Sequence, residues 1–324
     1  MAHWRRQLGA TFAALVLGTA ATGAFAARDW TLVDVGTLGG PGSYGAAVSN
    51  NGYVAGCADV AAGGAHAFLY RAGVMQDLGT AGGSPTGSSC GLAVNNEGVV
   101  AGRSSTGELV VWKEDRITRL GINGNIGAVS DSGVVVGSYS EGGVNRGFMW
   151  KGGVLTTLPM DFAAAINSRG QIAGLANGHA ALWEKGTLRD LGTLGGGFSR
   201  ANGINDRGDV VGMSSDNNAA PMPFIYHGTM QALPGPSYSA AIAINNRGTV
   251  VGSGEGIYGY IIEDGTVTRL DRIPAVAAKG WRHLEPTGIN DRGWIVGTGI
   301  NAEGDLRAFL LIPSNNKPLF IGGQ

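Results

Sequence analysis

The stretch Asn205-Asp206-Arg207-Gly208-Asp209-Val210-Val211-Gly212 is one of seven variants of a single motif, Asn-x-x-Gly-x-Val-Val-Gly, along this chain. The closing glycines of successive copies lie 35 to 46 residues apart. A period of this length is typical of repeat architectures, in which each unit is one small supersecondary structure. The copies are Ser49–Gly56, Asn95–Gly102, Ser130–Gly137, Asn167–Gly174, Asn205–Gly212, Asn245–Gly252 and Asn290–Gly297.

The motif predicts a hairpin turn between two strands. Asn at the first turn position can accept a hydrogen bond from the backbone two residues later, and Gly at the fourth position tolerates a positive φ. Asp131, Asp206 and Asp291 occupy the second position of their turns. We interpret them as local turn caps, and not as a ring of carboxylates or calcium ligands, because Asp and Asn favour such turns for local reasons.

Two further strands recur with the same period. An apolar strand follows each hairpin, as in Pro223–Tyr226, and a tight turn then leads to a last strand such as Met230–Leu233. The final repeat lacks this last strand because the chain ends shortly after Leu311. The missing strand is present at the other end of the chain, where Trp30–Gly36 precedes Thr37-Leu38-Gly39-Gly40.

These repeats predict an all-β fold, a seven-bladed β-propeller of four-stranded antiparallel blades whose last blade is closed by the N-terminal strand. If the ring begins at Ala27, the remaining 298 residues give about 43 per blade, within the roughly 40 to 50 residues of propeller repeats. An open solenoid of the same strands is the alternative. We expect the propeller to occupy residues 27–313 and a short tail to occupy residues 314–324.

The first 26 residues have the pattern of a signal peptide. Arg5-Arg6 precede an apolar run from Leu8 to about Ala21, and Ala24-Phe25-Ala26 is a typical cleavage site. We expect export to the periplasm or the extracellular space, with no integral membrane segment after cleavage. An uncleaved anchor is the alternative, although the run is short and interrupted by glycine. The arginine pair leaves the twin-arginine route open beside the general one.

Composition and motifs exclude several function classes. A net charge of −1 with 15% charged residues offers no basic surface for nucleic acid. The five histidines lack metal-ligand spacing, so we assign no metal and no cofactor. Asp209 and Glu285 belong to no pairing pattern, and no nucleophile motif is present. We therefore assign no catalytic residue. We also expect the protein to be a monomer.

Loop length points to one face of the ring as the binding face. Loops that join strand two to strand three, and strand four to the next blade, share one face, and all the longer segments belong to this loop-bearing face. Aromatic residues precede several hairpins by odd offsets, so along extended strands they would point the same way. The predicted ligand-binding residues are Tyr44, Phe198, Arg200, Tyr238, Trp281 and His283. Packing between blades is the alternative role for these aromatic residues.

Cys57 and Cys90 are the only two cysteines of the chain. Cys57 follows strand two of one repeat and Cys90 precedes strand one of the next, so both should lie at the loop-bearing face on adjacent blades. An exported protein favours a disulfide between them. Two free buried thiols are the alternative, because a bridge needs Cα atoms closer than about 7 Å.

The repeat resembles that of the HAF-repeat family of extracellular bacterial proteins. The resemblance rests on His66-Ala67-Phe68-Leu69-Tyr70 with Asp77-Leu78-Gly79-Thr80, and on Gly192-Thr193-Leu194-Gly195-Gly196 with Gly203-Ile204-Asn205-Asp206. It covers nearly all of the chain after the signal peptide, and it implies export and repeats but no activity. The slot of His66 holds other residue types in most repeats, so we expect no common chemical role for it.

From these features we expect an exported, non-catalytic binding module that recognises a glycan or a cell-envelope protein at its loop-bearing face. A hydrolase or lyase of extracellular polysaccharides is one alternative, because a propeller can assemble a catalytic site from isolated residues on different blades. A structural component of the cell surface or matrix is the other, and it would have no defined ligand.

Overall fold

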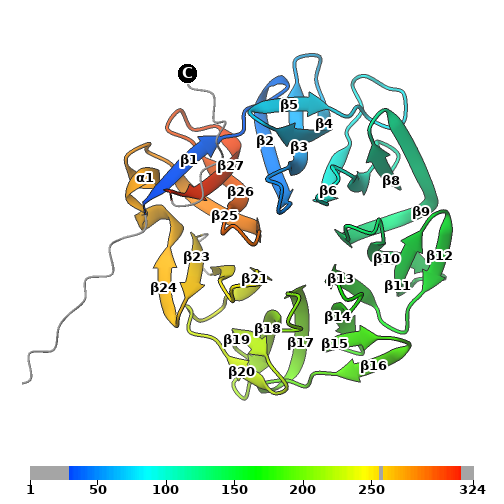
Figure 1. Cartoon of the computed structure of the whole chain (residues 1–324), viewed down its shortest axis with the longest axis vertical. Helices are drawn as coiled ribbons and strands as arrows, with labels where there is room; N and C mark the ends of the chain where they lie inside the picture. Colours follow the sequence, from blue (N-terminus) through cyan, green and yellow to red (C-terminus); the bar gives the residue numbers. More distant parts are fainter. Residues whose placement is uncertain (1–28, 255–257, 315–324) are drawn as a thin grey trace, which may run out of the picture.

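The computed structural model describes residues 29–254 and 258–314 of the chain. Within these residues it is an all-β structure of 27 strands with two short helices, η1 (Leu270–Arg272) and α1 (Pro274–Ala277). Figure 1 shows the strands gathered into small sheets that stand side by side around a common centre. The expected signal peptide, residues 1–26, and all but the first residue of the expected tail, residues 314–324, lie outside the described residues.

The predicted four-stranded antiparallel unit is confirmed. Four sheets contain four strands in chain order, as expected for hairpins that follow one another. They comprise β2 (Gly39–Val48), β3 (Val54–Val60), β4 (Ala65–Arg71) and β5 (Val74–Asp77); β13 (Phe162–Ile166), β14 (Ile172–Ala176), β15 (His179–Glu184) and β16 (Thr187–Asp190); β17 (Gly195–Ile204), β18 (Val210–Asp216), β19 (Pro221–Tyr226) and β20 (Met230–Ala232); β21 (Ala240–Ile244), β22 (Val250–Gly254), β23 (Tyr258–Glu263) and β24 (Thr266–Arg269).

The described residues form six sheets, and not the seven separate sheets that the repeats predict. The difference is one seven-stranded sheet, which runs from β6 to β12 and spans two repeats. Its central strand β9 is 14 residues long and pairs with β8 through its first half and with β10 through its second. Although Gly121 has a φ of 72° and the register with β8 shifts there, β9 continues without a break, so two repeats share one strand. The sheet comprises β6 (Cys90–Val94), β7 (Val100–Arg103), β8 (Glu108–Lys113), β9 (Arg116–Val129), β10 (Val135–Glu141), β11 (Val144–Lys151) and β12 (Val154–Thr157).

The remaining sheet joins the two ends of the chain. It contains β25 (Arg282–Ile289), β26 (Ile295–Ile300), β27 (Leu306–Pro313) and, at its edge, β1 (Trp30–Asp34). The antiparallel register places Trp30 opposite Pro313 and Asp34 opposite Phe309. This pairing of the N-terminal strand with the last apolar strand is the one that the split repeat predicts.

The hydrophobic core lies in layers between neighbouring sheets. In one layer, Val54 and Phe68 of the first sheet pack with Val296 and Leu310 of the last sheet. The closing glycine of the motif keeps the strands of a sheet close. At Gly56, an added Cβ would overlap the carbonyl oxygen of Tyr44 and come within 2.8 Å of Phe68. The recurrence of this glycine therefore has a packing cause.

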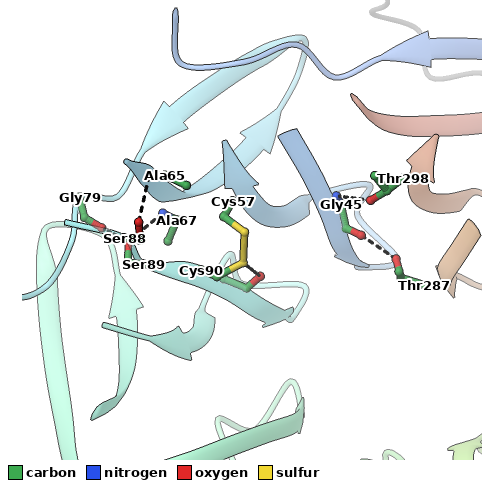
Figure 2. The surroundings of a disulfide bond; sticks show 11 residues. Gly45, Cys57, Ala65, Ala67, Gly79, Ser88, Ser89, Cys90, Thr287 and Thr298 are labelled. Atoms are coloured by element: carbon green, nitrogen blue, oxygen red, sulfur yellow. Dashed lines mark hydrogen bonds between the residues drawn. A yellow bond between two sulfur atoms is a disulfide. The ribbon is translucent and has the colours of Figure 1, made fainter. Parts of the chain in front are cut away.

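Buried serines join neighbouring sheets at the loop-bearing face. Ser89 Oγ accepts a hydrogen bond from the backbone N–H of Ala67 at 2.8 Å and donates to Gly79 O at 2.6 Å, as Figure 2 shows. Ser199 accepts from Ala180 in the same way, at 2.8 Å. Ser43 accepts from Ala308 at 2.9 Å and so joins the first sheet to the last.

The slot of His66 has a common role in several repeats, contrary to our expectation. A residue at or next to the start of the third strand contacts a residue of the strand paired with it, and both members of the pair differ in type between repeats. Such cross-strand pairs stabilise the outer edge of a sheet. The pairs are His66–Asp77 at 2.9 Å, Glu108–Arg119 at 2.5 Å, His179–Asp190 at 2.8 Å and Tyr258–Arg269, whose guanidinium lies 4.1 Å from the ring centre.

Candidate functional site

A groove of about 410 Å³ opens on the loop-bearing face, where the first sheet meets the last. We call it the seam groove. Its lining comes from β2 and β3, from the first residue of β4, and from the loop between β26 and β27 with the first residue of β27. The side chains that give it chemical character are those of Tyr44, Asp59, Asp305 and Leu306. Loops placed on a rigid sheet scaffold are the usual position of binding residues.

Tyr44 is the aromatic residue of the seam groove. It lies opposite Cys57 in the β2–β3 ladder, and 40% of its surface is exposed. Partial burial raises the pKa of its hydroxyl, and the nearby carboxylate of Glu285 raises it further, so the hydroxyl stays protonated at neutral pH. Leu306, across the groove, is 55% exposed. The groove thus presents an aromatic ring and an aliphatic side chain to solvent.

The carboxylate of Asp59 is fixed within the groove. Its Oδ2 accepts a hydrogen bond from the backbone N–H of Gly42 at 3.0 Å. An added Cβ at Gly40 or Gly42 would collide with Asp59, so the two glycines allow β2 to pass close to this side chain. A carboxylate beside an exposed ring can accept hydrogen bonds from hydroxyl groups of a ligand stacked on the ring.

The predicted disulfide between Cys57 and Cys90 is confirmed. As Figure 2 shows, it joins β3 of the first sheet to β6 of the next. The two Cα atoms are 4.6 Å apart. Cys57 also lines the seam groove. Figure 2 further shows that Gly45 of β2 is bonded to the last sheet: it receives a hydrogen bond from Thr287 Oγ1 at 2.8 Å and donates its N–H to Thr298 Oγ1 at 3.2 Å. The strand behind the groove is therefore tied to both neighbouring sheets.

Loss of the disulfide should destabilise the protein by about 2–4 kcal/mol, because the bridge closes a loop with a sequence separation of 33. Thermal unfolding of the Cys57→Ser/Cys90→Ser double variant, compared with the oxidised protein, measures this loss. Alkylation of the native protein without reductant, followed by mass spectrometry, should give no label. Two labels on the folded protein would show that the bridge is absent.

The other predicted ligand-binding residues do not line the seam groove. Phe198 and Arg200 lie on β17, Tyr238 lies just before β21, and His283 lies on β25. Phe198 is 36% and Tyr238 58% exposed. Arg200 Nε donates to Asn202 Oδ1 at 3.0 Å. The structure therefore distributes these residues over the β17–β20 sheet, the β21–β24 sheet and a part of the last sheet outside the groove, and of the predicted residues only Tyr44 lines the groove.

Trp281 belongs to the core, so its assignment to the ligand site is wrong. Only 7% of its surface is exposed, and it packs edge-to-face on Phe309 with ring centres 6.4 Å apart. The odd-offset argument fails because β25 has an irregular register between Arg282 and Glu285, and His283 there has a φ of 52°. An extra residue in a strand reverses the alternation of side chains beyond it.

A second cavity, of about 630 Å³, opens at the face that carries the hairpin turns of the motif. The strands are antiparallel, so this face is opposite the loop-bearing face. Its lining combines apolar residues that end the first strands, such as Val129 and Ile166, with the polar turn residues that follow them. We call it the turn cavity. The motif predicted these residues on turns, but nothing in the sequence indicated directly that the turns surround a cavity.

Hydrogen bonds between neighbouring turns build the wall of the turn cavity. Asn at the first turn position donates its side-chain N–H to a carbonyl of the next turn, as Asn205 does to Asn245 at 3.2 Å. The second position accepts from the backbone of the preceding turn. Asp206 Oδ1 accepts from the N–H of Ser168 at 2.8 Å, and Asp131 and Asp291 accept in the same way from Asn96 and Asn246. Our interpretation of the three aspartates as local caps is therefore wrong.

Electrostatics agree with this role. Although burial opposes it, the hydrogen bonds from Ser168 and Asn246 hold the pKa of Asp206 below its ordinary value. Asp209, for which no partner was predicted, is buried. It is hydrogen-bonded to Asn205 at 2.8 Å, to Arg207 at 2.9 Å and to His227 at 2.5 Å. Burial acts to raise the pKa of Asp209, but these hydrogen bonds, of which the one to His227 has the largest effect, lower it below its ordinary value. Asp206 thus connects the motif turns of neighbouring repeats, whereas Asp209 connects its own turn to His227 in the β19–β20 turn of the same sheet.

Neither a metal-binding cluster nor a membrane-spanning helix is found in the part of the chain that the structure describes. Residues 29–254 and 258–314 contain no group of three or more His, Cys, Asp or Glu side chains that could hold a metal ion. Among the same residues, no helix is long and apolar enough to cross a membrane.

Comparison with known proteins identifies the fold. No protein-family model matches the sequence, and no curated protein matches it. Among solved structures, the chain is similar to the WD40 β-propeller domain of Doa1, with 15% identity and a TM-score of 0.52 over 87% of this chain and 97% of that one. It is also similar to YCF48 bound to D1 peptide, with 11% identity and a TM-score of 0.51 over 88% of this chain and 96% of that one. The chain thus has a propeller-like fold.

Proposed function

We propose that the chain is an exported, non-catalytic binding module that recognises a glycan in the seam groove of its loop-bearing face. The observation that carries the proposal is the groove itself, which places the exposed ring of Tyr44 beside the carboxylates of Asp59 and Asp305. Aromatic rings stack on the C–H faces of sugars, and carboxylates accept hydrogen bonds from sugar hydroxyls. The groove also falls within the roughly 300–1,000 Å³ of ligand pockets.

A rigid ring supports this function. We infer a closed ring of seven four-stranded blades, in which β9 contributes its two halves to adjacent blades. The pairing of β1 with β27 supports closure, as do the contacts of β2 with β25, β26 and β27. Closure would place the seam groove at the junction that holds the ring together, where Thr287, Thr298 and Ser43 fix the backbone. A preorganised groove loses little entropy when it binds a ligand.

Export is supported by the disulfide, because such bonds persist in oxidising compartments. The pattern of residues 1–26 and the resemblance to the HAF-repeat family favour the same location, the periplasm or the extracellular space. A glycan fits the groove better than an envelope protein does, because a stable protein interface covers about 800 Å² on each partner and would extend far beyond this groove.

Truncation of Tyr44 tests the proposal. We expect Tyr44→Ala to weaken binding to the best glycan of an array by roughly 1–3 kcal/mol, about 5- to 150-fold, because aromatic anchors carry much of the binding energy. Titration calorimetry on the chain from residue 27 onward measures the affinity, and thermal unfolding shows whether the fold is intact.

Tyr238→Ala is the matched control, because Tyr238 is more exposed than Tyr44 and lies outside the seam groove. Its affinity should equal that of the unmodified protein. Equal loss in both variants would place the ligand across the whole face. An array with no glycan hit, combined with capture of one defined envelope protein that Tyr44→Ala abolishes, would replace the glycan by a protein ligand.

A further inference from the structure

The wall of the turn cavity has a gap between the third and fourth turns of the motif. At the other six junctions, a side-chain oxygen at the second turn position accepts a backbone N–H from the preceding turn. At the third-to-fourth junction this position is Ser168, whose side chain is hydrogen-bonded to Asp206 of the next turn. Within the described residues, no acceptor is found for the backbone N–H of Asp131. The second-position N–H makes the bond at five of the other junctions, and the third-position N–H of Asn51 makes it at the first-to-second junction.

Exposure and cavity shape agree with the gap. Asp131 and Ser168 are exposed, whereas the second-position residues of the other five turns are partly buried. The turn cavity also extends outward at this junction, because Ser132, Val134 and Gly170 line it here and no residue at those turn positions lines it elsewhere. The first turn position is Ser130, whose hydroxyl is bonded to Ser132 at 3.1 Å and does not cross to the next turn. Both sets of bridging bonds are thus missing at one place.

The fifth-to-sixth junction shows which chemical group would complete the wall. The carboxamide of Asn246 accepts the backbone N–H of Asp206 at 2.7 Å and donates its own N–H to Asp206 Oδ2 at 2.8 Å. Asp131 occupies the same turn position as Asp206 and offers the same backbone donor and carboxylate acceptor. Its carboxylate already accepts from Asn96 at 2.7 Å, and a carboxylate has about four acceptor sites, so capacity remains.

We propose that the gap is a binding site for a carboxamide group of a ligand, which takes the place of the missing side chain. The ligand C=O accepts from the backbone N–H of Asp131, and the ligand N–H donates to its carboxylate. An N-acetylated sugar and an asparagine side chain both carry this group. Val129, Val134 and Ile166 line the cavity at this junction and offer apolar contact to the rest of the ligand. The site lies on the face opposite the seam groove and does not depend on the function proposed there.

Amide chemical shifts of ¹⁵N-labelled protein, titrated with N-acetylglucosamine, N-acetylasparagine amide and glucose, test the site. We expect saturable shifts at the backbone amides of Asp131 and Ser132 with at least one carboxamide probe, and none with glucose, which lacks the group. A response to both carboxamides means that only the amide is recognised, and a response to one identifies the source as sugar or peptide. Absence of shifts with both carboxamide probes at millimolar concentration, or equal shifts with glucose, overturns the proposal.

Ser168→Asn supplies the missing carboxamide from the chain itself. We expect it to weaken probe binding at least tenfold and to raise the melting temperature by about 2 °C, because one bridging hydrogen bond is gained. Ser168→Ala is the matched control, since it leaves the gap open and should bind the probe as the unmodified protein does. Unchanged binding in Ser168→Asn, with the melting temperature raised, contradicts the site. If that variant does not fold, Asp131→Ala, which keeps the N–H but loses the acceptor, must still weaken binding.

Discussion

A chain that begins at Leu38, and so lacks β1, should lose more than about 5 kcal/mol of its free energy of unfolding. Leu32 is 2% exposed and packs in the layer that contains Phe309 and Leu311. Removal of a buried leucine alone costs about 2–5 kcal/mol. Removal of the whole strand also leaves the edge of β27 unpaired. For a domain with a total stability of about 5–15 kcal/mol, this loss is severe.

Hydrogen exchange locates the effect. Protection of the amides from Phe309 to Ile312 should fall most, although these residues lie at the opposite end of the chain from the deletion. A chain that begins at Asp29 keeps β1 and is the control, with protection equal to that of the full chain. Unchanged protection at β27 in the shorter chain would contradict a stabilising role for the N-terminal strand.

The sequence allowed the repeat unit to be predicted because its signals are local. A turn with Asn and Gly, followed by two short apolar strands, is specified within about 30 residues, and the same logic identified Trp30–Gly36 as a displaced strand. The sharing of β9 by two repeats was not predicted. A break between strands depends on one or two residues near Gly121, where the chain can either turn or stay extended, and periodicity does not distinguish these outcomes.

The contacts between repeats were harder to predict than the repeats themselves. Asp206 resembles a local turn cap in sequence, but its carboxylate bonds to Ser168 and Asn246, which lie 38 and 40 residues away. In the sequence, these residues are related only because they occupy equivalent positions in successive repeats. That relation does not show which side chain reaches which neighbouring turn. The gap at Ser168 was missed for the same reason, because a serine is harmless in an isolated turn. For Trp281 the sequence analysis left both a ligand contact and packing between blades open. It could not decide between them because a local bulge reverses the side-chain alternation, and a bulge leaves little trace in sequence.

Trp281→Ala should destabilise the protein by about 3–5 kcal/mol, the range for removal of a buried aromatic side chain. The indole packs edge-to-face on Phe309 and contacts Gly299, where an added Cβ would lie 3.2 Å from the ring. The surrounding layer includes Leu284 and Val276, both nearly fully buried. Because α1 supplies Val276 and sheet strands supply the other neighbours, the cavity left by the indole cannot collapse without moving both elements.

Denaturant unfolding of Trp281→Ala and Tyr238→Ala separates core packing from ligand contact. Tyr238 is 58% exposed, so its removal should change stability by less than about 0.5 kcal/mol. At concentrations where both variants are folded, their affinity for a seam-groove ligand should match that of the unmodified protein, because neither residue lines that groove. A loss below about 1 kcal/mol for Trp281→Ala, together with weakened binding, would instead make the tryptophan part of a ligand platform. The layer between β25 and β27 would then tolerate a void that close packing does not ordinarily allow.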